Sequence, residues 1–146
     1  MKKYVKIAFA YAVAAMAFGV FYREFTKFND FVGKTSLAVT HLHLFVLGSI
    51  VMLVLGLIDA RYDISLHKLY KPTMILYNVA LPYMVIMFTV RGVLQVVSDS
   101  LSSGADGAVS GIAGIGHAAM GVAIVLLFIV LLKTDYGKKA NENQNL

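Results

Sequence analysis

The sequence predicts an all-α integral membrane protein, a four-helix bundle with both termini in the cytoplasm. Three observations support this prediction: the composition, four long apolar runs, and the basic residues that flank those runs. Of the 146 residues, 59% are hydrophobic and 14% are charged. Soluble domains carry about 25% charged residues, so the composition excludes an ordinary soluble enzyme.

The spans are predicted from four apolar runs, at residues 5–22, 36–58, 74–97 and 109–132. Each run is about 20 residues long, enough for a helix to cross roughly 30 Å of hydrocarbon. None of them alternates polar and apolar residues with a period of two, which argues against membrane β-strands. Short connections predict that neighbouring helices pack antiparallel. We expect one transmembrane domain over residues 1–136 and a disordered polar tail over 137–146.

The basic residues divide unequally between the two sides of the predicted bundle. One side would carry Lys2, Lys3, Lys6, Arg61, Lys68, Lys71, Lys133, Lys138 and Lys139, and the other Arg23, Lys27 and Lys34. By the positive-inside rule, this bias places both termini of this multi-pass membrane protein in the cytoplasm. The net charge of +5 is explained by these anchors to the lipid bilayer, so no nucleic-acid partner is expected.

Three histidines and one arginine lie inside the predicted spans, where ionisable side chains are costly and need partners. They are His41 and His43 in the second run, Arg91 in the third and His117 in the fourth. At about 1.5 Å per residue, His41 lies about 8 Å, Arg91 about 9 Å and His117 about 12 Å from the outer side. These residues therefore share one layer in the outer half of the membrane.

Histidines that face each other across a helix bundle are a known way of holding haem iron. The chain has no cysteine, which excludes thiolate-bound clusters and covalently attached haem. Residues at i and i+2 point about 200° apart on a helix. One histidine of the His41/His43 pair should therefore face its own bundle and the other a second cofactor or a neighbouring subunit. The sequence leaves open which one does so.

Two further features bear on this site. Arg91 would pair with haem propionates, which Arg23 and Lys34 could also reach from the outer rim; alternatively, Arg91 snorkels to the interface. His117 shares a helical face with Gly114 and Gly121, which would leave room for a flat macrocycle. The alternative is a small-residue stripe for close helix packing, with the histidine bonded to a neighbouring helix.

The string Val39-Thr-His-Leu-His-Leu-Phe-Val-Leu-Gly48 resembles the His-x-His helix of haem–copper oxidase subunit I. In that family the first histidine of the pair binds a high-spin haem and the second a low-spin haem. Gly116-His-Ala-Ala-Met120 is similar to the segment that supplies the opposite low-spin ligand, although its Met follows the histidine by three residues instead of four. The chain also resembles small uncharacterised bacterial four-span proteins related to that subunit, and this resemblance implies a multi-pass protein of the bacterial inner membrane.

The resemblance, which covers roughly two of the four helices, implies that His43 and His117 ligate one low-spin haem while His41 faces a second site. The oxidase subunit has twelve helices with approximate threefold symmetry, so four helices repeated in a homotrimer would rebuild its ring. Its copper site needs three further histidines and a tyrosine. This chain has no other histidine in the membrane layer, so oxygen reduction by a single subunit is not expected.

We therefore expect a membrane protein that binds haem b non-covalently through two histidines. Its role would be one-electron transfer, with a quinol or another redox partner, or haem-based sensing. Two alternatives remain: a haem-free copper or zinc site on three imidazoles, and a non-catalytic scaffold whose histidines bridge helices. The i, i+2 spacing disfavours the metal site because it directs the pair apart. No catalytic motif is present, so whether the protein is an enzyme stays open.

Overall fold

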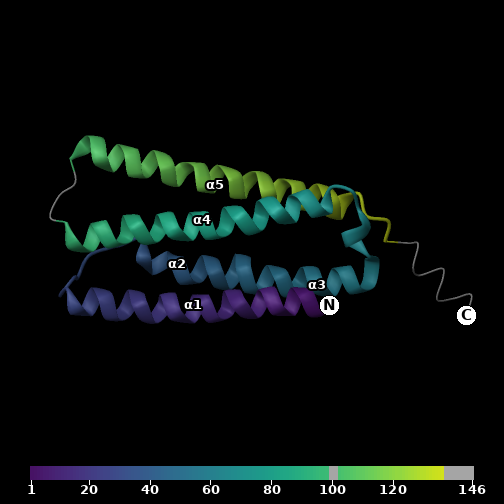
Figure 1. Cartoon of the computed structure of the whole chain (residues 1–146), viewed down its shortest axis with the longest axis horizontal. Coiled ribbons are helices and arrows are strands. Elements are labelled where there is room, and N and C mark those ends of the chain that lie inside the picture. The colour runs from purple at the N-terminus through teal and green to yellow at the C-terminus, as the bar shows by residue number, and fades with distance from the viewer. Residues whose placement is uncertain (99–101, 137–146) are drawn as a thin grey trace, which may run out of the picture.

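The computed structural model describes residues 1–98 and 102–136, and this part of the chain is all-helical (Figure 1). Helix α1 (Lys2–Phe28) is followed by a composite second span. That span comprises α2 (Leu37–His43), the π-helical segment η1 (Leu44–Ile50) and α3 (Val51–Tyr62). A short 3-10 turn, η2 (Ile64–Leu66), leads to α4 (Tyr70–Val97), and α5 (Ser103–Leu132) completes the fold.

All four spans are long and apolar enough to cross a membrane, which confirms the predicted all-α, four-span architecture. Helix α5 begins at Ser103, earlier than the apolar run that predicted it at residue 109. The reason is an N-cap: the Ser102 hydroxyl accepts a hydrogen bond from Ala105 N at 3.3 Å. Asp106 in the first turn adds a favourable charge at the helix N-terminus. The predicted tail, residues 137–146, lies outside the described residues.

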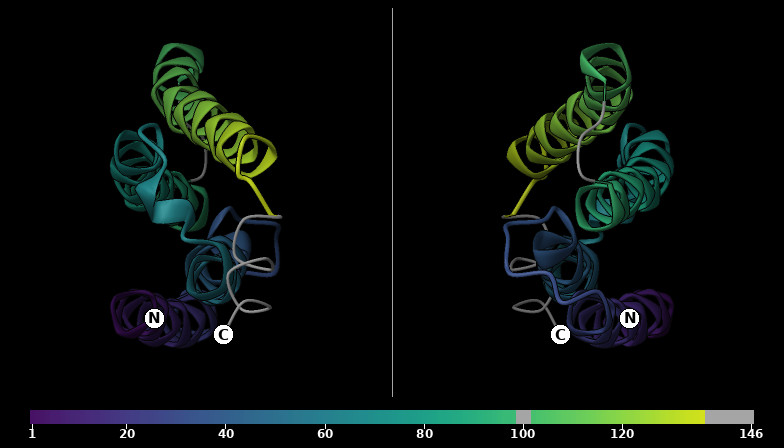
Figure 2. Two further views of the ribbon diagram at one scale, coloured as in Figure 1. Left: turned by 90° about the vertical axis from the view of Figure 1, so that its right-hand side faces the viewer. Right: turned by 90° about the vertical axis from the view of Figure 1, so that its left-hand side faces the viewer.

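The four spans form an open row. Helix α1 packs along the second span, the first part of the second span (α2 and η1) packs on α4, and α5 packs on α4. Figure 2 shows α1 and α5 at opposite edges of this arrangement. Among the described helices, α5 packs closely against α4 alone, so much of its surface is left uncovered. The start of α1 and the end of α5 lie at the same end of the row (Figure 1).

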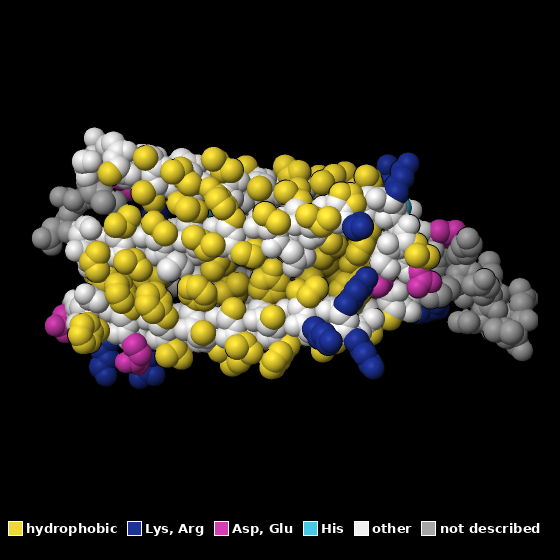
Figure 3. Space-filling view, in the orientation of Figure 1, with side chains coloured by type: hydrophobic (Ala, Val, Ile, Leu, Met, Phe, Trp, Pro, Cys, Tyr) yellow, Lys and Arg dark blue, Asp and Glu magenta, His cyan; other side chains and the backbone are white. Residues whose placement is uncertain are grey.

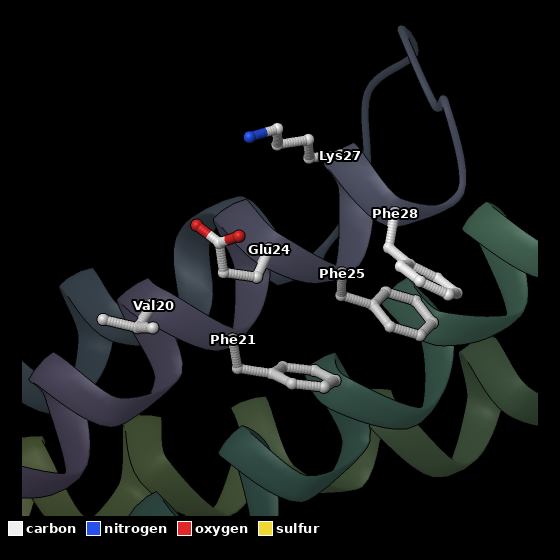
Figure 4. A pocket seen from close by; sticks show the side chains of 6 residues that line it. All are labelled: Val20, Phe21, Glu24, Phe25, Lys27 and Phe28. Atoms are coloured by element: carbon white, nitrogen blue, oxygen red, sulfur yellow. The ribbon is translucent and has the colours of Figure 1, made fainter.

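The surface has the pattern that a bilayer requires. Large apolar side chains such as Phe9, Val20 and Ile115 are exposed along the helices. On the face shown in Figure 3, lysines and arginines gather towards the two ends and leave an apolar middle. Figure 4 shows Phe21, Phe25 and Phe28 on one side of the C-terminal end of α1, away from Lys27. Such an aromatic patch suits the membrane interface.

Buried phenols fix the first two spans to α4. Tyr4 and Tyr70 share a 2.5 Å hydrogen bond between their hydroxyls, and Tyr11 donates to Asn78 Oδ1 at 3.0 Å. Tyr77 donates to Leu47 O in the π-helical segment at 2.9 Å. In a medium without water each such group needs an internal partner, so these contacts set the register between helices.

Gly48 lets Tyr11 of α1 pack directly on the backbone of the second span, because a Cβ placed there would collide with the Tyr11 side chain. Gly111 on α5 has nothing within 4 Å of the same position and provides a matched control. We expect Gly48→Ala to lower the free energy of unfolding by about 1–3 kcal/mol through overpacking. Gly111→Ala should be neutral or stabilising by about 0.5–1 kcal/mol. Unfolding in mixed detergent micelles measures both, and equal stabilities would contradict the packing described.

Candidate functional site

His43 is the last residue of α2, and its imidazole points towards α4. Its ring centroid lies 4.8 Å from that of Phe88, with the planes tilted by 58°. Its Nδ1 lies 2.8 Å from Val39 O. Because a carbonyl oxygen can only accept, Nδ1 must carry the proton, and in the neutral ring the lone pair is then on Nε2. This is the arrangement in which a histidine binds a metal through Nε2.

His117 in the middle of α5 repeats this arrangement. Its Nδ1 lies 3.2 Å from Ala113 O, again on its own helix, so Nε2 carries the lone pair. Its ring lies 5.1 Å from the Phe88 ring, in an edge-to-face contact at 77°. His43 and His117, from two helices that do not pack closely on each other, therefore meet at one side chain of α4. The centroids of the two imidazoles are therefore separated by no more than the sum of their distances to the Phe88 centroid, 4.8 Å for His43 and 5.1 Å for His117.

Gly114 and Gly121, which share a helical face with His117, do not serve packing among the described residues. A Cβ added at Gly114 or Gly121 would meet nothing within 4 Å. The buried Gly116 behaves differently, since a Cβ there would lie 2.8 Å from the Tyr83 ring of α4. The face of α5 that carries His117 is thus flat and open, and the alternative of a packing stripe against another described helix is not what the structure shows.

Phe88 is the residue that the sequence analysis missed. A phenylalanine in an apolar helix carries no signal by itself, and only the fold shows that it contacts both histidines. The one available clue was its position: Phe88 lies one turn before Arg91 on α4, in the layer of the predicted site.

His41 points away from this pair, towards α1. Its ring lies 6.4 Å from the Tyr22 ring at an angle of 14°, and its side chain is 3.8 Å from a Cβ placed at Gly19. Its Nδ1 is buried without a hydrogen-bond partner, the one such side-chain atom among the described residues. The two members of the His-x-His pair thus face different helices of the same chain, and His41 does not converge with His43 and His117.

Arg91 has a protein partner that the sequence did not predict. Its Nη2 lies 3.7 Å from Asp106 Oδ1, with the two side chains 33% and 53% exposed. The early start of α5 brings Asp106 into the helix and within reach of α4. A pair this exposed contributes about 1 kcal/mol or less to stability. At the rim, Arg23 lies 3.7 Å from Glu24, with both side chains largely exposed.

The described residues contain no group of three or more histidine, cysteine, aspartate or glutamate side chains that could hold a metal ion. Three imidazoles therefore do not converge on one ion within the described part of a single chain. The donor set that does come together is a pair, His43 and His117. Two neutral imidazoles, each anchored through Nδ1, are a donor set of the chemical type that can hold haem iron.

Comparison with known proteins places the chain without assigning it an activity. The model of a family described as proteins of unknown function, DUF2871, matches residues 1–134. No curated protein and no solved structure matches the chain. Nothing in these findings links the chain to haem–copper oxidase subunit I. Since the match covers nearly all of the sequence, including every described span, the chain belongs to the DUF2871 family.

Proposed function

We propose that the protein binds haem b non-covalently in the membrane, and that Nε2 of His43 and Nε2 of His117 would hold its iron. The observation that carries this proposal is the meeting of the two imidazoles at Phe88, each with Nδ1 on its own helix. When bound, haem would supply one-electron chemistry, for electron transfer or for sensing. The family description neither supports nor opposes this function.

The role of the protein residues follows from their bonds. Each Nδ1–H donates to the carbonyl four residues earlier, which holds the ring in one tautomer and restricts its rotation. The open face at Gly114 and Gly121 offers a flat macrocycle a surface on α5. Because the Phe88 ring contacts both imidazoles, a macrocycle between them would require that ring to turn aside. Arg91 stands one turn farther out and could exchange Asp106 for a propionate.

These contacts argue against the scaffold alternative. A histidine that bridges helices would bond to a neighbouring helix, whereas Nδ1 of His43 and Nδ1 of His117 bond to their own. The haem-free metal alternative lacks a third converging ligand among the described residues. A pair of imidazoles alone leaves a copper or zinc ion short of its usual coordination.

Orientation and assembly complete the proposal. The end of the row that holds the start of α1 and the end of α5 also carries most of the basic residues, so we place it in the cytoplasm of a bacterial cell, with the spans in the inner membrane. The uncovered face of α5 would pack against another copy in a homotrimer of twelve helices. Small residues on that face allow such an approach.

The haem proposal predicts a visible spectrum. Protein purified after expression with added haem should show a Soret band and a low-spin α band in the dithionite-reduced minus oxidised spectrum. His43→Ala and His117→Ala should each lower bound haem by roughly tenfold or more, because an axial ligand is lost. His67→Ala, which removes a histidine outside this site, is the control. Wild-type protein without a Soret band would disprove the proposal.

The assembly proposal predicts a trimeric mass. Native mass spectrometry or light scattering on detergent-solubilised protein should give three times the 15.9 kDa of the chain. Replacing Gly114 by Phe should shift the population towards monomer, since the bulky ring would occupy the open face of α5. A monomeric or dimeric wild type would rule out the trimer and leave haem ligation within one chain untouched.

A further inference from the structure

A second site, on the other side of the second span, is formed by the groove between α1 and that span. The groove has a volume of about 670 Å³ and an apolar lining that includes Met16, Gly19 and Val20 from α1 and Leu42, Phe45 and Val46 from the second span. Small-molecule sites usually measure roughly 300–1,000 Å³. The larger of these side chains are exposed on the outer surface, so the groove is open to the lipid.

Two polar side chains, His41 and Arg23, lie in the wall of this groove, and His41 is the one that lacks a partner for a buried atom. Its Nδ1 is buried and unpaired, and no described residue forms a hydrogen bond with the ring. A neutral imidazole has one N–H, and a buried N–H without a partner is rarer in proteins than an unpaired acceptor. The proton therefore belongs on Nε2, which is not among the buried unpaired side-chain atoms of the described residues. His41 thus offers an unused hydrogen-bond donor, the opposite tautomer to that of His43 and His117.

The charges around the groove favour a neutral ligand. Arg23 also lines it, but this side chain is paired with Glu24 at 3.7 Å and is largely exposed, so it is not a vacant anion site. His41 lies one helical turn inside Leu37, the first residue of its span, or about 6 Å along the axis. A carbonyl oxygen on a lipid-soluble ring would reach this depth with its tail in the bilayer.

We propose that the groove between α1 and the second span binds a quinone, whose ring carbonyl accepts a hydrogen bond from Nε2 of His41. The site stands on His41 and the groove alone and does not require haem at His43 and His117. If both sites are occupied, the quinone lies on the opposite side of the same helix, two residues from an iron ligand. The step proposed here is binding, not oxidation or reduction.

Binding of decylubiquinone to the full chain in phosphatidylcholine nanodiscs tests the site. Wild-type protein should bind it saturably, and His41→Leu should weaken binding about tenfold through loss of one hydrogen bond. His41→Gln, which keeps an N–H donor, should recover most of the affinity. Gly19→Leu should also weaken binding, because it fills the groove beside the His41 side chain, whose atoms are the three nearest to a Cβ placed at Gly19. His67→Leu is the matched control.

The outcomes separate this site from the haem site. His43→Ala should lose haem yet bind quinone as the wild type does, and His41→Leu should keep its haem spectrum. His41→Leu should also unfold at a higher temperature, since it removes the buried unpaired nitrogen. Absence of saturable binding, or equal binding by wild type, His41→Leu and Gly19→Leu, would overturn the proposal. So would loss of binding when phosphatidylglycerol is added, because it would identify the occupant as an anionic lipid.

Discussion

The structure depends on one constraint: in hydrocarbon, polar groups must find partners within the protein. The phenol contacts between Tyr4 and Tyr70 and between Tyr11 and Asn78 join α1 to α4 in this way. His43 and His117 meet the same requirement by bonding back to their own helices. These bonds use Nδ1 of each ring and leave the lone pair on Nε2. The same bonds therefore satisfy one nitrogen and keep the other in the form that could bind a metal. Nδ1 of His41 is the one buried side-chain nitrogen or oxygen of the described residues that has no hydrogen-bond partner.

The π-helical segment η1 begins directly after His43 and is the least regular part of the spans. Its wider turn changes which residues share a face. On a regular α-helix, Phe45, Gly48 and Met52 would all follow His41 along one side, yet Gly48 and Met52 are buried whereas Phe45 is 46% exposed. Tyr77 donates to Leu47 O within the segment, and Gly48 admits the Tyr11 ring. Such segments often accompany functional sites, and this one separates the histidines from the tightly packed inner half.

The open row of helices gives the protein two unequal sides. Between α1 and α4 the packing is tied by hydrogen bonds, whereas α5 is held along α4 with its small-residue face uncovered. A lipid or a second copy of the chain can cover that face without any cost from buried polar groups, except at His117. Because His117 lies on this face, a copy of the chain that packs there would also contact the proposed haem ligand.

The sequence by itself determined the four spans and their class, because about 20 consecutive apolar residues have no other stable arrangement in a bilayer. It also predicted a common depth for the histidines, since rise per residue depends on local geometry alone. Only the tertiary structure decided towards which helix each of these side chains points. The contact of His43 and His117 with Phe88, the turn of His41 towards α1, and the pairing of Arg91 with Asp106 all depend on how helices pack. Packing is fixed by side chains distant in sequence, and no single apolar run carries that information.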